Sequence, residues 1–133
     1  MGASISESKA MAAEEYFNSI HPINLTPLAR IWKKLKTKHD GIVLVFQPGY
    51  YCNILGRHSD VSHNRYACYG NDAEVLNRVM GCPIYKEQSV STQKIEVDKV
   101  EVLECFVKVT HEALEKAGYK AYWINPTDLL KEY

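Results

Sequence analysis

Four tyrosines and two arginines lie within one stretch of the sequence, residues 50–69. Aromatic rings stack on nucleic-acid bases, and arginine side chains contact phosphates and also stack on bases. The same tyrosines are equally suited to a β-sheet, where they would be half-buried with hydrated hydroxyl groups. Both interpretations stay open at this point. The residues are Tyr50, Tyr51, Tyr66, Tyr69, Arg57 and Arg65.

The same stretch holds two cysteines and two histidines, which are the ligand types of a structural zinc site. They are Cys52, His58, His63 and Cys68. Their spacing fits no standard zinc finger and contains no close cysteine pair. A nucleophilic Cys52–His58 pair is a further alternative, which requires hydrogen-bond geometry. The spacing favours free thiols and solvent-exposed histidines, so we expect neither a metal nor a cofactor.

The acidic residues do not indicate an active site. Aspartates and glutamates are scattered over predicted helix faces, and the sequence has no glycine-rich ATP-binding loop. Glu96 and Asp98 alternate along a predicted strand and could hold a metal, but a solvated rim residue and a helix cap explain them as well. We therefore expect a non-enzymatic binding protein.

Length and composition describe a single globular domain. The chain has 133 residues, 46% hydrophobic and 24% charged, and no apolar run approaches the roughly 20 residues that span a bilayer. We expect an intracellular protein, either cytoplasmic or in the nucleoid or nucleus, without a membrane partner.

The net charge is zero, yet the charges are uneven along the chain. Residues 27–66 carry seven cations and two anions, so +7 − 2 = +5, and the remainder sums to −5. A basic segment of this kind can hold a polyanion. The charge pattern by itself favours the alternative, a solvated helix face rich in lysine. The lysines concerned are Lys33, Lys34 and Lys36, with Lys38 nearby.

Helices and strands alternate along the chain, which predicts an α/β fold with a mixed β-sheet flanked by helices. Thr26 caps and Pro27 begins a helix, and residues 42–47 form a buried central strand that Pro48-Gly49 breaks. We expect residues 1–22 to be a tail and helix, and residues 23–133 to be one domain. We also expect a strand over 50–55, a loop over 56–64 and a strand over 65–69 that pairs back on the strand before it. After these come a helix capped by Asn71, an edge strand over 82–85 and a strand over 92–97. A helix that starts at Asp98 and a last strand over 119–124 complete the expected elements.

Several of these pieces occur in an order that resembles the N-terminal mismatch-recognition domain, domain I, of the MutS family of DNA mismatch-repair proteins. The resemblance spans about residues 24–124. It is carried by Leu25-Thr26-Pro27-Leu28, Lys34-Leu35-Lys36, Val45-Phe46-Gln47-Pro48-Gly49-Tyr50-Tyr51, Asp72-Ala73 and Leu114-Glu115-Lys116-Ala117-Gly118-Tyr119-Lys120.

The resemblance implies DNA binding through the segment that follows Gly49. In that family the glycine turn leads into a Phe-x-Glu element, whose phenylalanine wedges beside a mispaired base and whose glutamate hydrogen-bonds it. Aligned on the glycine, Tyr51 and Asn53 stand at these two positions, so both residues of the pair are changed. Aligned instead on Asp72-Ala73, Arg65-Tyr66 stand there.

The resemblance also implies a free-standing copy of one domain, because the ATPase parts of a MutS protein have no counterpart in this sequence. The expected partner is DNA or another nucleic acid, with a larger protein supplying any ATPase activity. The alternative is a protein–protein interaction module that keeps the fold and has lost DNA recognition. The nucleic-acid-binding residues that follow from this reading are Gly49, Tyr50, Tyr51, Asn53, Arg57, Arg65, Tyr66, Lys33, Lys34 and Lys36.

Overall fold

The computed structural model describes residues 15–54, 57–88 and 95–127, and it describes side chains for all of these except residues 50–62. The body of the protein is a five-stranded mixed β-sheet in the order β5-β6-β4-β1-β7. The expected α/β fold with a mixed sheet is thereby confirmed. The strands are β1 (Ile42–Gln47), β4 (Arg65–Tyr69), β5 (Tyr85–Gln88), β6 (Glu96–Leu103) and β7 (Ala121–Ile124).

Strand β1 lies inside the sheet, between an antiparallel neighbour, β4, and a parallel one, β7. Its first four residues are buried, because helices cover both faces of the sheet at this point. This is the central strand that the continuous apolar run predicts. Gly41 precedes it at a tight approach, where an added Cβ would stand 2.5 Å from the carbonyl oxygen of Lys120.

Helix α2 (Pro27–Lys36) packs against β1 and β4, and its Trp32 indole donates to the carbonyl oxygen of Val43 at 2.8 Å. The hydroxyl of Thr26 accepts from the Ala29 N–H, so the predicted cap is confirmed. Helices α3 (Gly70–Met80) and α4 (Val107–Lys116) pack against each other on the other face, where the His111 side chain of α4 meets Trp123 of β7. Short 3-10 turns precede α2 (η1, Pro22–Asn24) and α4 (η2, Glu104–Phe106).

The helical residues 15–19 belong to the same core as the rest of the body. Phe17 is buried, and its ring meets the Trp32 ring edge-on with centroids 5.1 Å apart. The Tyr69 ring completes this cluster, 5.9 Å from Trp32. An edge-to-face aromatic cluster of this kind fixes the position of α2 on the sheet.

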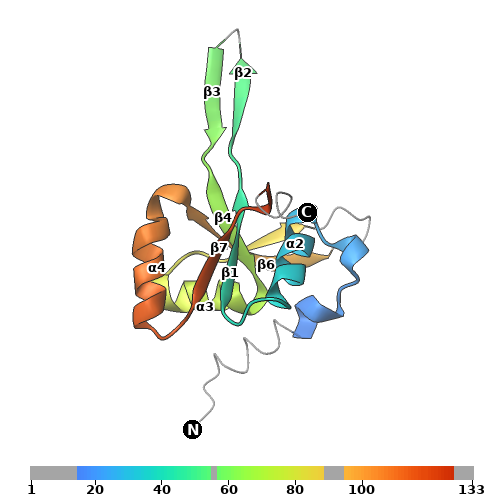
Figure 1. Cartoon of the computed structure of the whole chain (residues 1–133). Helices are drawn as coiled ribbons and strands as arrows, with labels where there is room; N and C mark the ends of the chain where they lie inside the picture. Colours follow the sequence, from blue (N-terminus) through green and yellow to red (C-terminus); the bar gives the residue numbers. More distant parts are fainter. Residues whose placement is uncertain (1–14, 55–56, 89–94, 128–133) are drawn as a thin grey trace.

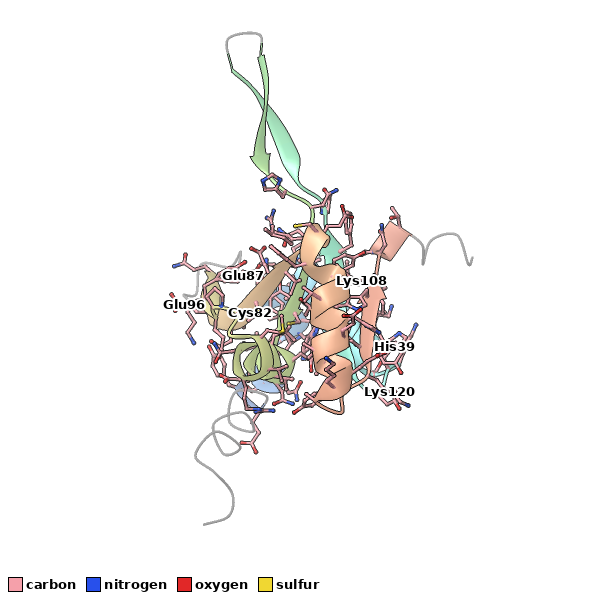
Figure 2. The ribbon with its side chains drawn as sticks, turned by 90° about the vertical axis from the view of Figure 1, so that its left-hand side faces the viewer. His39, Cys82, Glu87, Glu96, Lys108 and Lys120 are labelled. Atoms are coloured by element: carbon pink, nitrogen blue, oxygen red, sulfur yellow. The ribbon has the colours of Figure 1, made fainter. Side chains whose placement is uncertain are left out.

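Strands β1 and β4 continue beyond the sheet as a second, two-stranded sheet, which we call the arm. It consists of β2 (Tyr50–Ile54) and β3 (Arg57–Ser62), paired antiparallel with a register shift between Tyr50 and Tyr51. Figure 1 shows the arm rising from the end of the body, and the view turned by 90° in Figure 2 shows the same separation. His39 and Lys120, labelled in Figure 2, lie at the opposite end of the body.

Three expectations about secondary structure were wrong. Residues 57–62, expected as a loop, form β3, and β4 pairs with β1 instead of with residues 50–55. The sequence of β3 is polar and shows no apolar alternation, so no periodicity marks it as a strand. Residues 98–103, expected to begin a helix, belong to β6, where the buried side chains of Val97, Val100 and Val102 suit a sheet better than a helix.

Two smaller differences concern α3 and β5. Helix α3 begins at Gly70 with Tyr69 as its cap residue, so Asn71 lies in the first turn instead of capping it. The edge strand is Tyr85–Gln88 instead of residues 82–85, but it does lie at the edge of the sheet. Gly81 ends α3 with a left-handed φ of 71°, as its position predicts. Within the described ranges, no helix is long and apolar enough to cross a lipid bilayer.

Candidate nucleic-acid interface

The arm leaves the sheet between two residues that pair directly, Gln47 of β1 and Arg65 of β4. Beyond them, the side-chain oxygen of Asn64 accepts from the Gly49 N–H at 2.8 Å. The backbone oxygen of Asn64 accepts from the Glu104 N–H at 3.0 Å, which ties the same residue to η2. Asn64 therefore joins both strands at the base of the arm and fixes the bend that Pro48-Gly49 introduces.

A charged network supports this base from below. Its centre is Lys99 of β6, whose side chain is only 5% exposed. The Lys99 ammonium group donates to Glu87 at 2.7 Å and to Gln47 at 3.1 Å, and lies 3.4 Å from a Glu101 oxygen. Glu101 in turn accepts from Arg65 at 2.6 Å. At the base of the arm, Gln47 is thus bound directly to the Lys99 cation, and Arg65 is linked to it through the Glu101 carboxylate.

The network continues away from the arm to the beginning of α2. Glu87 on the edge strand accepts from the Tyr69 hydroxyl at 3.0 Å and from the Thr26 hydroxyl at 2.6 Å. Figure 2 shows Glu87 on the side of the body formed by the edge strand. Thr26 therefore has two roles, because it also caps α2.

Burial and charge in this network shift two pKa values in opposite directions. Burial raises the pKa of the Tyr69 hydroxyl, and the adjacent Glu87 carboxylate raises it further. For Glu101, burial acts to raise the pKa, but hydrogen bonds from Tyr85 and Arg65, together with the charge of Lys99, outweigh burial and hold the pKa below its usual value. At neutral pH, Tyr69 is accordingly a neutral donor and Glu101 is ionised.

The candidate residues Arg65 and Tyr66 are packed into the body. The Arg65 guanidinium is committed to Glu101 and to the backbone oxygen of His63. The Tyr66 ring meets Phe46 and Trp123 edge-on, each with centroids 5.3 Å apart. In the alignment on Asp72-Ala73, the pair expected to contact a mispaired base is therefore Arg65-Tyr66, and both side chains are already bound within the body.

The remaining candidates of the tyrosine-rich stretch lie on the arm. Tyr50, Tyr51 and Asn53 belong to β2, and the register places Tyr51 opposite Asp60 and Asn53 opposite His58. Arg57 begins β3. The side chains of these residues lie outside the described part of the chain, so their roles stay predictions.

The structure does not gather the four potential zinc ligands. Cys68 is fully buried in β4, three residues into the body from Arg65, whereas Cys52 and His58 lie on the arm. Cys52 and Cys68 are about eight strand positions apart, a contour of roughly 26 Å at ~3.3 Å per residue. Burial raises the pKa of the Cys68 thiol well above its usual value, which favours the protonated form. Among the described residues, no group of three or more histidine, cysteine, aspartate or glutamate side chains could hold a metal ion.

The three candidate lysines of α2 differ from one another. Lys36 is committed to the body, because its ammonium group donates to Gly41 O at 2.7 Å and to the buried Asp72 carboxylate at 3.0 Å. Lys34 is exposed, and Lys33 is half-buried. Lys36 and Gly41 lie where β1 begins, at the end of the strand away from the arm. The structure therefore separates the arm from the Lys36 end of α2 instead of forming one continuous interface.

The sequence was compared with protein-family models and with curated proteins. Neither comparison gave a match. The resemblance to MutS domain I accordingly remains a prediction from the residues that carry it.

The charged network was missed by reasoning from the sequence. A lysine among the alternating valines of residues 97–102 was the available signal, since a buried cation requires an acidic partner. Placing a helix start at Asp98 concealed that signal. Glu87 gave no comparable signal, because it lies in the polar run Lys86-Glu87-Gln88-Ser89 that follows the proline-containing segment.

Proposed function

We propose that this protein is a non-enzymatic nucleic-acid-binding module whose contact element is the arm. The observation that carries the proposal is the shape of this element: two antiparallel strands that stand clear of the body and continue its central strands. The major groove of B-DNA admits a two-stranded β-ribbon, and several DNA-binding proteins use strands in this way. Five- and six-residue strands reach about 17–20 Å, which is enough to cross such a groove.

The composition of the arm suits this role. Tyr50 and Tyr51 supply rings for stacking, Asn53 supplies a group that hydrogen-bonds base edges, and Arg57 supplies a cation for phosphate. The resemblance to MutS domain I supports the same assignment, because it puts Tyr51 and Asn53 where that family reads a mispaired base. DNA that contains a mismatch or another unpaired base is therefore the first ligand to examine.

The sharpest test removes the arm and leaves the sheet intact. Because Gln47 pairs directly with Arg65, replacing residues 48–64 by Asn-Gly closes β1 and β4 with a two-residue hairpin turn. Binding of matched, mismatched and branched duplexes and of single strands is then measured by fluorescence anisotropy at two salt concentrations. We expect the wild type to bind at least one of them, more weakly at high salt, and the armless variant to lose most of that affinity.

A matched pair of point variants refines the test. Arg57→Ala and Ser59→Ala both lie on β3, but only the first removes a cation. We expect Arg57→Ala to weaken binding and to reduce the salt dependence by about one phosphate contact, and Ser59→Ala to change it little. Equal affinity of the wild type and a folded armless variant would exclude the arm as the contact element.

Protein binding through the arm is the second candidate function. Within the described residues, β2 pairs with β3 alone, so the outer edge of each strand is open to an added strand. Exposed apolar side chains near the base of the arm also favour a protein partner: Leu103, Phe106 and Val109. A complex that depends on the arm in an affinity purification, combined with no binding to any nucleic acid at low salt, would favour this candidate over the first.

A further inference from the structure

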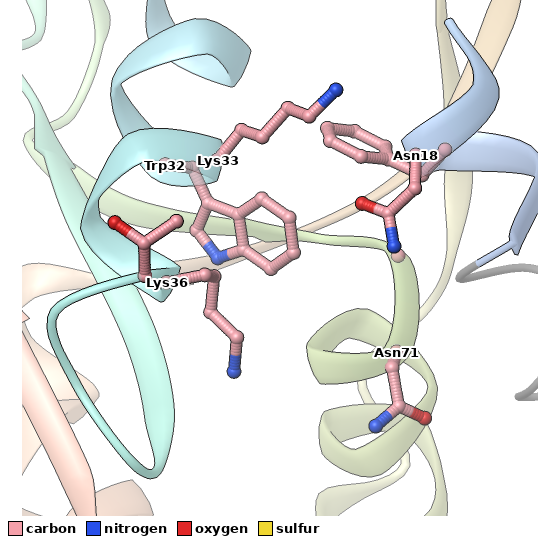
Figure 3. Close-up of a pocket in the computed structure, with 8 residues that line it drawn as sticks. Asn18, Trp32, Lys33, Lys36 and Asn71 are labelled. Carbon is pink, nitrogen blue, oxygen red and sulfur yellow. The ribbon is translucent and has the colours of Figure 1, made fainter.

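A pocket of about 240 Å³ lies between α2, the beginning of α3 and the helical residues 15–19. Figure 3 shows it with Lys33 and Lys36 on either side of the Trp32 indole, and with Asn18 and Asn71 across from α2. Phe17, Thr37 and Gly70 complete the lining. None of the lining residues belongs to the arm, so the pocket is separate from the arm, although Lys33 and Lys36 are also among the candidate lysines of α2.

The two lysines make the pocket electropositive. The Lys36 charge is offset by Asp72, whose carboxylate is buried and also accepts from the Val43 N–H at 3.0 Å. The partner of the Lys33 ammonium group is the backbone oxygen of Ile20 at 3.4 Å, which is a neutral acceptor. Among the described residues, two lysines and one aspartate leave a net charge of +1 at the pocket. Lys33 supplies that charge, and its ammonium group has three donors.

The other lining groups suit a small oxyanion with an organic substituent. The side chains of Asn18 and Asn71 each carry an amide NH₂ donor, and Thr37 carries a hydroxyl. The Trp32 and Phe17 rings form an apolar wall, which can contact the carbon atoms next to an anionic group. Gly70 lies beside these rings, and a Cβ built there would be in ordinary contact with the Trp32 ring at 3.6 Å.

We propose that this pocket binds a phosphate monoester, with Lys33 as its principal charged contact. A phosphate group matches a lysine point charge flanked by neutral donors, and the volume leaves room for a small substituent beside the rings. Two sources share this chemistry: a free phosphorylated metabolite and the terminal phosphate of a nucleic-acid strand. The inference does not depend on the function proposed for the arm.

The test uses the two tryptophan indole N–H signals in a ¹H–¹⁵N correlation spectrum. The Trp32 indole lines the pocket, whereas the Trp123 indole donates to His111 on the other face and serves as an internal reference. We expect inorganic phosphate, added at constant ionic strength against chloride, to shift the Trp32 and Gly70 signals saturably and to leave Trp123 in place. Shifts that never saturate, or that affect both indoles equally, would overturn the proposal.

A neighbouring lysine provides the matched control. Lys33→Ala removes the principal charge, and Lys34→Ala removes an exposed charge from the next position of the same helix. We expect Lys33→Ala to weaken phosphate binding at least about tenfold, and Lys34→Ala by less than about twofold. Equal weakening by both variants would show general attraction to a basic helix and would reject the site.

Comparing ligands then distinguishes the two sources. A nucleoside monophosphate is compared with its nucleoside, and a 5′-phosphorylated oligonucleotide with its unphosphorylated form. Tighter binding of the nucleoside monophosphate than of the phosphorylated oligonucleotide identifies a metabolite site. Tighter binding of the phosphorylated oligonucleotide than of the nucleoside monophosphate identifies a strand-end site. The proposal fails if the phosphate makes no difference in either pair. The armless variant should retain the Trp32 shift, which separates this result from the outcome for the arm.

Discussion

Gln47 and Arg65 face each other across β1 and β4, and both are held by one buried charge network at the point where the arm begins. Gln47 accepts directly from Lys99, and Arg65 is linked to Lys99 through Glu101. Side chains of β6 that do not belong to the arm therefore hold the two residues from which it leaves the body. Variants of this network test how the body supports the arm.

Removing the central cation should destabilise the protein strongly. Lys99→Met keeps the aliphatic stem but leaves Glu87 and Glu101 without their shared cation, so we expect a loss of about 3–5 kcal/mol in the free energy of unfolding in urea. Lys86→Met is the matched control, because the Lys86–Asp98 ion pair lies on an exposed surface of the same two strands, and it should cost no more than about 1 kcal/mol. Similar losses for the two variants would contradict the central role of Lys99.

Acid should weaken the fold through Glu101. Its pKa is lowered in the folded protein from an ordinary value of 4.5, so its contribution to stability is complete above pH 4.5 and is lost as the pH falls through the lower folded value. Urea unfolding of the wild type from pH 6 to pH 3 should show this loss. Glu101→Gln should lower stability at pH 6 and flatten the decline below pH 4.5. A variant that declines as steeply as the wild type would assign the acid sensitivity to other carboxylates.

Lys36 and Lys34 should differ in how much they contribute to stability. Lys36→Ala removes the ammonium group that pairs with the fully buried Asp72 carboxylate, and we expect it to cost about 3 kcal/mol of unfolding free energy. Lys34→Ala, at an exposed position, should change stability by no more than about 0.5 kcal/mol. Thermal unfolding followed by circular dichroism measures both. An unchanged melting temperature for Lys36→Ala would show that Asp72 does not depend on this lysine.

Two glycines should respond differently to alanine. At Gly81 an added Cβ meets no atom within 4 Å, so Gly81→Ala should cost only about 1 kcal/mol for its left-handed backbone. At Gly41 the Cβ would stand 2.5 Å from Lys120 O, where β1 meets the segment before β7. Gly41→Ala should therefore cost clearly more, about 2 kcal/mol or above, in the same unfolding assay. A larger loss of stability for Gly81→Ala than for Gly41→Ala would mean that the contact between Gly41 and Lys120 relaxes without cost.

Local patterns in the sequence predicted the body well. Thr26-Pro27 marked the start of α2, the apolar run after Gly41 marked the central strand, and Gly81 marked the end of α3, because each of these signals acts over a few residues. The pairing of β4 with β1 instead of with β2 depends on contacts across the sheet that no local pattern records.

The candidate site was less predictable. Tyrosines and arginines near one another in the sequence pointed to one cluster, but the structure divides Arg65 and Tyr66 from the arm, because a strand carries its residues away from one another at about 3.3 Å each. The supporting network joins Thr26, Glu87 and Lys99, which lie far apart along the chain, and only the folded sheet brings them together.

Because the arm continues β1 and β4, its reach is adjustable in fixed increments. Inserting two residues into each of β2 and β3 would lengthen it by about 7 Å and keep each existing side chain on its own side of the ribbon. Inserting one residue into each would exchange the two sides beyond the insertion. Since the bonds at Asn64 and the network around Lys99 lie below these positions, the body would tolerate both changes, and selection could tune the span of the ribbon without rebuilding the sheet that carries it.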